Sequence, residues 1–418
     1  MSDARRVAYD VVRRSLDGGA YADRALDGEA TRGGLDARQR AFASFLALGT
    51  VQHLRTLDAA IASAAERSVD RLERPLLHAL RLGTFQLLFA GSVPDRAAVS
   101  ETVELVRAVV GQRATGLANA VLRKVATDGP AWLAALPEDS PEAAGLRHSL
   151  PDWICQLWFD SFGQRRALDL CRAANVPARS VLRPNPLRAA PGAVEAALTG
   201  AGIPFELDPA TGAIIVTGPF DLAGSKLHAT GMVVAQSLSS IAVVELVGAA
   251  AGERVLDLCA APGGKTAGLA ATGAAVTAVE SNPSRASALR ATLERLGAGE
   301  VEVVEGDGRV YGGGPFDAIL VDAPCSGLGV LNGRPDSRWR RTPSDVEALA
   351  VLQAELLTHA VELLAPGGRL VYAACTLSPD ENERVPRAVG LVPVSERRLW
   401  PGPGADGFYV ATLQPTGH

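Results

Sequence analysis

Several absences narrow the classes of protein to which this chain can belong. No run of about 18 apolar residues in the 418-residue chain is free of charge, so we expect no membrane span. The stretch from Met1 to Arg6 leads into an amphipathic pattern and not an apolar signal segment, which favours a cytoplasmic protein. The five cysteines are odd in number and lack Cys-x-x-Cys spacing, so the sequence indicates neither a disulfide framework nor a metal site.

Lysine is also scarce, because Lys124, Lys226 and Lys265 stand against 38 arginines. Because the chain uses arginine almost everywhere, Lys265, which lies in a glycine-rich turn, is a better candidate for a functional residue than a surface lysine. Subtracting Asp and Glu from Lys and Arg gives 19 − 18 = +1 for residues 1–150 and 15 − 21 = −6 for residues 231–418. A nucleic-acid partner would therefore have to bind to local basic patches, because the net charge of the chain does not attract it.

A chain of this length is too long for one ordinary core, and its apolar pattern divides it into three predicted domains. Residues 1–135 show apolar positions at helical spacing without strand-like alternation, which predicts an all-α domain. Residues 130–142, rich in Pro, Ala and acidic residues, are a predicted linker. Residues 145–230 join a long helix to short strand candidates at 180–183 and 214–217, which predicts a small α+β module.

Residues 231–418 have the alternating pattern of an α/β domain. Helices are expected between five strands, and the strands are expected over residues 254–258, 275–279, 300–304, 316–321 and 368–372. Strands that alternate with helices predict a doubly wound, Rossmann-like parallel sheet. In such a sheet, ligands bind outside the carboxyl ends of the strands.

A glycine-rich turn, Pro262-Gly-Gly-Lys265, follows the first expected strand. Glycines let the backbone approach a ligand, and the helix that follows offers free amides. Neither Gly-x-Gly-x-x-Gly nor a complete P-loop is present, which disfavours a dinucleotide and a nucleoside triphosphate. Glu280 ends the next strand, where an acid suits both ribose hydroxyls, and Asp307 ends the third, where it is expected to face an adenine amino group. Ribose and adenine without pyrophosphate indicate S-adenosylmethionine, although strand-end acids can also be ordinary turn residues.

Two cysteines follow two other expected strands. Cys325 lies in Asp322-Ala-Pro-Cys-Ser-Gly and Cys375 in Tyr372-Ala-Ala-Cys-Thr. Both are expected at the crevice that Lys265 borders, and a thiolate beside a lysine is a candidate nucleophile. The remaining thiols are expected to pack as small apolar groups, namely Cys155 and Cys171 on helical faces and Cys259 next to the glycine turn.

A methyl donor, a thiolate and an acid together suit one reaction. Pyrimidine C5 is too weak a nucleophile to take a methyl group, but addition of a thiolate to C6 turns the ring into an enamine. Asp322, hydrogen-bonded to N3 and the exocyclic amine, would favour that addition. The base has to leave its stack to reach such a pocket.

At these residues the chain resembles the RNA cytosine-C5 methyltransferase family, in its RsmB (Fmu/Sun) branch of 16S rRNA methyltransferases. Three long segments carry the resemblance: residues 256–266, 321–330 and 371–382. Residues 81–89, 99–105 and 117–123 are similar to the NusB RNA-binding fold. The resemblance implies a NusB-like helical domain, a small RNA-facing module and a class I methyltransferase domain.

The resemblance also implies roles for single residues. Cys375 is then the attacking nucleophile, Cys325 assists release of the product, and Asp322 and Lys265 complete the catalytic set. The implied cofactor pocket consists of Cys259, Ala260, Ala261, Pro262, Gly263, Gly264, Lys265, Glu280, Asp307, Gly308 and Asp322. The chain departs from the family's usual Thr and Ser around the nucleophile, with Ala374 and Thr376, and has Glu280 where Asp is common.

RNA contacts are expected around Trp339, which Arg334, Arg338, Arg340 and Arg341 surround, because arginines interleaved with an aromatic suit phosphate binding and base stacking. A solvated loop is the alternative. Arg5, Arg6, Arg13 and Arg14 form a second basic face that could contact RNA, although a solvated helix face is the usual interpretation. A loop or single strand is the favoured form of RNA, since the A-form major groove hides base edges.

We therefore expect a monomeric enzyme that transfers a methyl group from S-adenosylmethionine to C5 of a cytosine in small-subunit rRNA. A tRNA cytosine-C5 methyltransferase and a non-catalytic, NusB-related RNA-binding factor are the alternatives. A methyltransferase of small molecules or proteins explains neither the paired thiols nor the helical domain.

Overall fold

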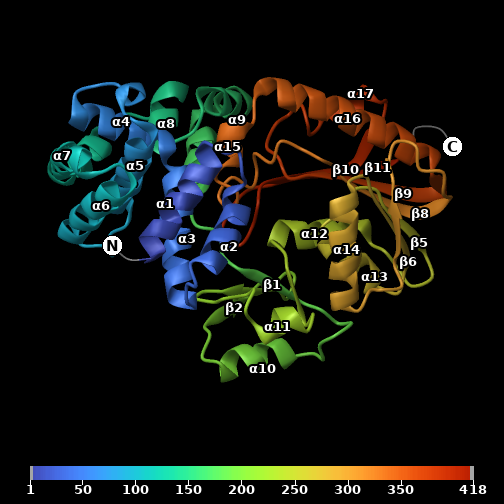
Figure 1. The fold of residues 1–418 in the computed structure, drawn as a ribbon. Helices are drawn as coiled ribbons and strands as arrows, with labels where there is room; N and C mark the ends of the chain where they lie inside the picture. The colour runs from blue at the N-terminus through green and yellow to red at the C-terminus, as the bar shows by residue number, and fades with distance from the viewer. Residues whose placement is uncertain (1–2, 415–418) are drawn as a thin grey trace. The chain divides into compact units, whose positions relative to one another are not determined.

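The computed structural model describes residues 3–414, so Met1 and Ser2, part of the segment compared with a signal sequence, lie outside it. The described chain forms two compact units. One unit runs to Val176 and includes Leu331–Arg340, and the other consists of Pro177–Val330 and the chain from Arg341 onward (Figure 1). Within the described residues, no helix is long and apolar enough to cross a membrane. The three-domain division at 135, 145 and 230 stays a prediction.

The first unit is helical, as its apolar periodicity predicts. Its α-helices are α1 (Asp3–Leu16), α2 (Ala22–Arg32), α3 (Ala37–Gln52), α4 (Leu54–Ala65), α5 (Arg74–Phe89), α6 (Asp95–Val109), α7 (Thr115–Ala135), α8 (Pro141–His148), α9 (Asp152–Ala173) and α15 (Ser337–Arg340). Two 3-10 turns, η1 (Val69–Arg71) and η2 (Gln112–Ala114), join them. Gly49 of α3 lets α5 approach closely, since a Cβ at Gly49 would lie 2.1 Å from Phe85 Cζ.

The linker predicted over residues 130–142 is wrong in its first half, because α7 continues through Pro130 to Ala135. Proline inside a helix removes one backbone hydrogen bond, so tertiary packing outweighs propensity here. Gly129 is buried against Leu88, whose Cδ2 would lie 2.8 Å from a Cβ at Gly129.

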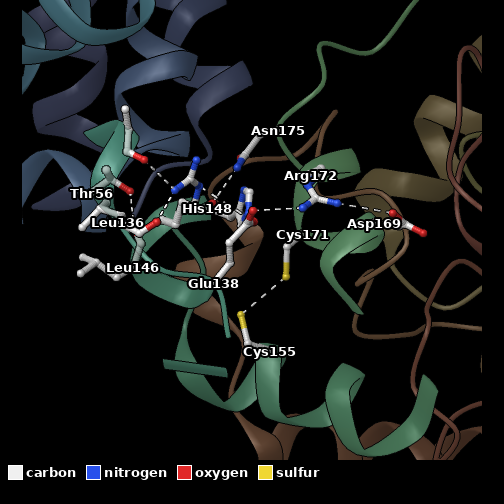
Figure 2. Close-up of polar contacts among 12 residues, drawn as sticks. Thr56, Leu136, Glu138, Leu146, His148, Cys155, Asp169, Cys171, Arg172 and Asn175 are labelled. Carbon is white, nitrogen blue, oxygen red and sulfur yellow. Dashed lines mark hydrogen bonds and ion pairs between the residues drawn. The ribbon is translucent and has the colours of Figure 1, made fainter. Parts of the chain in front are cut away.

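The segment after α7 is bound to the rest of the helical unit by polar contacts of its side chains (Figure 2). Glu138 accepts a hydrogen bond from His148 Nε2 at 2.7 Å and from Arg172 Nη2 at 3.1 Å, and Thr56 Oγ1 donates to Leu146 O at 2.6 Å. Cys155 and Cys171 are fully buried on α9 with their sulfur atoms 3.9 Å apart. The expectation that these two thiols are packing residues is confirmed.

Residues 331–340 pack into the helical unit, although the chain on both sides of them belongs to the other unit. Arg338 is fully buried, and its guanidinium donates to Ser149 O at 3.0 Å, to Ala174 O at 2.8 Å and to Asn175 Oδ1 at 2.9 Å. The indole N–H of Trp339 donates to Val51 O at 2.7 Å. For Arg338 the predicted RNA contact is therefore wrong, as is the alternative of a solvated loop, because the side chain is fully buried and both of its terminal nitrogens donate to protein oxygens.

The second unit begins with a small antiparallel sheet in the order β2-β3-β1-β4. Its strands are β1 (Val181–Pro184), β2 (Phe205–Leu207), β3 (Ile214–Val216) and β4 (Val233–Ala235), and its helices are α10 (Ala193–Gly200) and α11 (Lys226–Ala229). The strands predicted at 180–183 and 214–217 are confirmed as β1 and β3. The other two strands, β2 and β4, were not predicted.

A seven-stranded sheet in the order β10-β11-β9-β8-β5-β6-β7 forms the rest of this unit (Figure 1). Its strands are β5 (Arg254–Asp257), β6 (Ala275–Glu280), β7 (Glu302–Glu305), β8 (Phe316–Asp322), β9 (Leu364–Ala374), β10 (Val392–Leu399) and β11 (Phe408–Gln414). The five predicted strands are parallel neighbours, and β11 and β10 add antiparallel pairs at one edge. The predicted Rossmann-like sheet is confirmed.

Helices cover both faces of the seven-stranded sheet, which is why β8 reads as a continuous apolar run. They are α12 (Leu238–Val247), α13 (Gly264–Ala270), α14 (Pro283–Leu296), α16 (Pro343–Glu362) and α17 (Arg384–Ala388). Ala318 and Leu320 of β8 pack with α12 and α13, whereas Ile319 and Val321 pack with α16. The sheet is thus a rigid middle layer that fixes the loops at its carboxyl edge.

Candidate active site

The strand order reverses at β5, which has β6 on one side and β8 on the other. Loops that leave adjacent strands at such a switch point separate and leave room for a ligand. Here those loops are the glycine turn after β5 and the Cys325 loop after β8. The chain therefore brings two of its predicted motifs to the point of the sheet where binding is expected.

The glycine turn has a conformation that requires glycine. Gly263 precedes α13 with φ +105°, in the region that side chains rarely adopt. A Cβ at Gly263 would also lie 2.7 Å from Leu289 Cδ1 of α14. Without a side chain at Gly263, the backbone of the turn packs closely against α14. A loop that binds a ligand through its backbone needs such close packing.

Lys265 and Asp322 form an ion pair that joins the two loops. Lys265 Nζ lies 2.7 Å from Asp322 Oδ2, and the ammonium is also 5.2 Å from the centre of the Phe408 ring. Burial is the largest effect and lowers the pKa of Lys265, but Asp322, together with the charges of Cys375 and Asp257, outweighs it, so the pKa ends above its ordinary value. Lys265 is therefore a fixed positive charge, and the charge of Cys375 is among those that act on it.

The two predicted catalytic thiols lie together. Cys325 Sγ is 3.2 Å from Cys375 Sγ, although the residues are 50 positions apart in the sequence. The pKa of Cys325 is raised well above its ordinary value, first by its hydrogen bond with Cys375 and then by burial. The two sulfurs are close enough to share a hydrogen bond in which either can be the donor, and Cys375 is the one on which the Lys265 charge acts.

The predicted cofactor acids lie at the ends of neighbouring strands. Glu280 is buried at the end of β6, where Oε1 accepts from Asn282 N at 2.9 Å and Oε2 lies 3.3 Å from Arg285 Nη2. Asp307 follows β7 and forms an ion pair with Arg309 at 2.6 Å. Gly308 places this loop against the end of β5, because a Cβ there would lie 3.1 Å from Leu258 O. Their roles toward a cofactor stay predictions.

Cys259, Ala260, Ala261 and Pro262 line the start of the glycine turn. Ala260 N donates to Val279 O of β6 at 3.1 Å, which ties the turn to the strand that ends in Glu280. Burial, with the carboxylates of Asp257, Asp322 and Glu280, raises the pKa of the Cys259 thiol well above its ordinary value. Cys259 is therefore held as a neutral thiol, in agreement with a packing role.

Sequence reasoning missed two side chains of the small module that support the glycine turn. Arg183 Nη2 donates to Gly264 O at 3.0 Å, and Arg183 Nη1 would lie 2.1 Å from a Cβ at Gly268. Asn185 Nδ2 donates to Gly231 O and Leu296 O, each at 2.8 Å. Both side chains belong to the segment Leu182-Arg-Pro-Asn185, which resembles the family's RNA-facing module, and that resemblance did not indicate a support for the cofactor loop.

The carboxylate of Asp257, which ends β5, gives a test of whether these residues fit a sulfonium nucleoside. Asp257 is buried, Oδ2 accepts from Thr266 Oγ1 at 2.8 Å, and Oδ1 has no hydrogen-bond partner among the described residues. An orphaned acceptor beside a glycine turn suits the ammonium of an amino-acid moiety, and Glu280 suits a ribose. The donor set fits S-adenosylmethionine. Across residues 3–414, no group of three or more His, Cys, Asp or Glu is arranged to hold a metal ion.

Asp257→Asn is expected to stabilise the fold at alkaline pH. Burial, the largest effect, raises the pKa of Asp257 to about 7, whereas an unfolded Asp titrates at about 4. The folded state therefore retains a proton that the unfolded chain releases, so stability falls as the pH rises from about 4 to about 7. Melting temperatures should show a gain for Asp257→Asn at pH 8 that shrinks at pH 5. A gain of the same size at both pH values would contradict this account.

The reversed sheet order, the glycine turn and the acid that ends β6 define a Rossmann-like methyltransferase domain with S-adenosylmethionine as its cofactor. Comparison with family models supports this class. A model described as 16S rRNA methyltransferase RsmB/F matches residues 245–389, and the NusB family model matches residues 2–127.

Individual relatives extend the match to nearly the whole chain. The chain is 38% identical over 401 residues to a Mycobacterium tuberculosis protein named only as a methyltransferase, covering 90% of this chain and 84% of that protein. It is 33% identical to ribosomal RNA small subunit methyltransferase B of Vibrio cholerae, covering 98% and 97%. A solved methyltransferase homologue from Pyrococcus horikoshii has a TM-score of 0.59 and 28% identity, and covers 66% of this chain and 99% of its own. The chain belongs to the RsmB/F family of methyltransferases and carries a NusB-family domain.

Proposed function

We propose that this protein methylates C5 of a cytosine in 16S rRNA through a covalent bond between Cys375 and C6 of the base. The observation that carries the proposal is the pair of sulfurs 3.2 Å apart, beside the Lys265–Asp322 ion pair. Membership of the RsmB/F family and the NusB-family domain support RNA, and small-subunit rRNA, as the substrate.

The chain's own residues supply the activation of the base. The Cys375 thiolate adds to C6, and the electron pair of the C5–C6 double bond moves toward N3, which takes a proton supplied by the Lys265 ammonium through Asp322. C5 then has the character of an enamine carbon. Bound S-adenosylmethionine supplies a methyl group with the electrophilic character of a methyl cation.

Release restores both the aromatic ring and the thiolate. Water in the site takes the proton on C5, the electron pair of that C–H bond re-forms the C5–C6 double bond, the bond between Cys375 and C6 breaks with its electron pair on sulfur, and N3 returns its proton through Asp322 to Lys265. Cys325 lies against that sulfur and assists this step. Two thiols are therefore needed for two half-reactions at one ring edge.

Transfer of tritiated methyl groups from S-adenosylmethionine to total RNA that lacks this modification tests the proposal. Digestion of the product to nucleosides should give label in 5-methylcytosine from 16S rRNA. Label in tRNA would preserve the chemistry but overturn the rRNA assignment. Label in another nucleoside would overturn the cytosine-C5 reaction.

A further inference from the structure

A buried polar network lies behind the two thiols, and Glu381 is at its centre. Glu381 is fully buried, and Oε1 accepts from Ser326 N at 2.7 Å and from Gln353 Nε2 at 3.1 Å. Oε2 accepts from Ser326 Oγ and, at 3.3 Å, from Thr376 Oγ1. All of these donors are neutral groups, so the carboxylate is held by hydrogen bonds alone.

The donors to Glu381 are the residues that directly follow the two cysteines. Ser326 follows Cys325, Thr376 follows Cys375, and their hydroxyl oxygens are 2.8 Å apart. One carboxylate therefore joins the loop after β8 to the loop after β9 at the position next to each sulfur. Thr376 thus keeps the hydroxyl of the serine that is usual in the family.

Other buried groups fix the carboxylate itself. Tyr372 OH donates to Glu381 O at 2.5 Å and to Gln353 Oε1 at 3.0 Å. Gln353 Nε2 also donates to Pro324 O at 2.8 Å, on the other side of Cys325. The Glu381 side chain has little freedom to move, because hydrogen bonds hold its backbone and connect it to both sides of Cys325. The distance between the two sulfurs is therefore fixed by buried groups.

The charges around the two sulfurs differ. The Lys265 ammonium acts on Cys375, which favours a thiolate there. The Glu381 carboxylate acts on Cys325, where it adds to the hydrogen bond and burial that already raise the pKa of that thiol. Lys265 and Glu381 thus act on different members of a pair of chemically identical groups.

We propose that Glu381 is the positioning residue that fixes the two thiol loops and keeps the shared proton on Cys325, so that Cys375 is the attacking sulfur. The consequence for catalysis rests on the proposed function, whereas the inequality of the two sulfurs does not. Glu381 touches no reacting atom and acts only through Cys325, Ser326 and Thr376.

The test is limited alkylation by iodoacetamide at fixed pH, without RNA or S-adenosylmethionine, with the label on each cysteine measured by peptide mass spectrometry. In the native protein, alkylation should favour Cys375. In Glu381→Gln, which retains the shape of the side chain without its charge, the ratio of Cys375 to Cys325 alkylation should fall about tenfold, as for a shift of about one pKa unit between the two thiols.

In the same variant, kcat for methyl transfer should fall by about a hundredfold, the loss that follows a misplacement of about 1 Å. The KM for S-adenosylmethionine should stay unchanged, which a general loss of structure would not allow. Glu383→Gln is the matched control, because Glu383 lies two residues away and pairs with Arg398 at 2.7 Å, outside the network. It should retain the native alkylation ratio and kcat.

A folded Glu381→Gln protein with the native alkylation ratio, or with the native kcat, would overturn the proposal. If Glu381→Gln does not fold, Ser326→Ala carries the test, since it removes a hydroxyl donor and leaves the carboxylate. Ser326→Ala should lower kcat and preserve the preference for Cys375, and an unchanged kcat would overturn the role of Glu381. If Glu381→Gln shifts the alkylation ratio but the native protein methylates no RNA, the proposed function is contradicted and the role of Glu381 toward the two thiols is not.

Discussion

Cys375→Ala is expected to abolish methyl transfer to RNA while S-adenosylmethionine still binds. The variant lacks the sulfur that adds to C6, and without that addition C5 does not attack a methyl group, so turnover should fall by about 10⁴-fold or more. The glycine turn and the Lys265–Asp322 ion pair are untouched. Single-turnover methyl transfer and calorimetric titration with S-adenosylmethionine measure the two effects.

Cys171→Ala is the control for that experiment. It also removes a buried thiol, but one of the helical unit, 3.9 Å from Cys155 and outside the proposed site. It should retain turnover. Measurable turnover in Cys375→Ala would show that another group attacks the base, and loss of cofactor binding would show that the thiol supports the fold of the site.

Cys325→Ala should have the opposite phenotype, an accumulated covalent complex with RNA. Cys375 can still add to C6 in this variant, but the partner that assists release is gone, so the protein should remain bound to its substrate. The complex should survive a denaturing gel and disappear on treatment with ribonuclease. Normal turnover without a complex would contradict the two-thiol mechanism.

The double replacement of Cys325 and Cys375 separates the two roles. If the complex in Cys325→Ala is a bond to Cys375, the double variant should form none. A complex that persists in the double variant would assign the bond to another residue.

The predictable parts of the fold are the helices and strands whose burial gives the sequence a recognisable apolar pattern. The central strands β5, β6 and β8 of the large sheet are mostly buried, and their apolar runs mark them. β10 was missed because it is an edge strand, with Pro393 and charged residues, and with Val392 and Val394 exposed. With none of its side chains fully buried, β10 lacks the apolar pattern on which the prediction depends.

The residues of the proposed site were predictable where they lie in loops that follow the carboxyl ends of strands. Lys265, Asp322, Cys325 and Cys375 were all named from loops after strands, and the structure brings them together. Glu381 was not, since it follows no strand end and its partners are a backbone amide and neutral side chains. A buried carboxylate without a cation has no signature in a single sequence.

The burial of Arg338 has a consequence for the order in which the protein forms during synthesis. The helical unit takes its last segment from Leu331–Arg340, after most of the methyltransferase strands have been made. Until that segment is made, the guanidinium is missing from four oxygens of the earlier chain, namely the backbone oxygens of Gln52, Ser149 and Ala174 and the amide oxygen of Asn175. The helical unit is therefore incomplete in the nascent chain until residues about 150 positions after the end of α9 have been translated. A fragment cut at the end of that helix would lack a piece of its own interior.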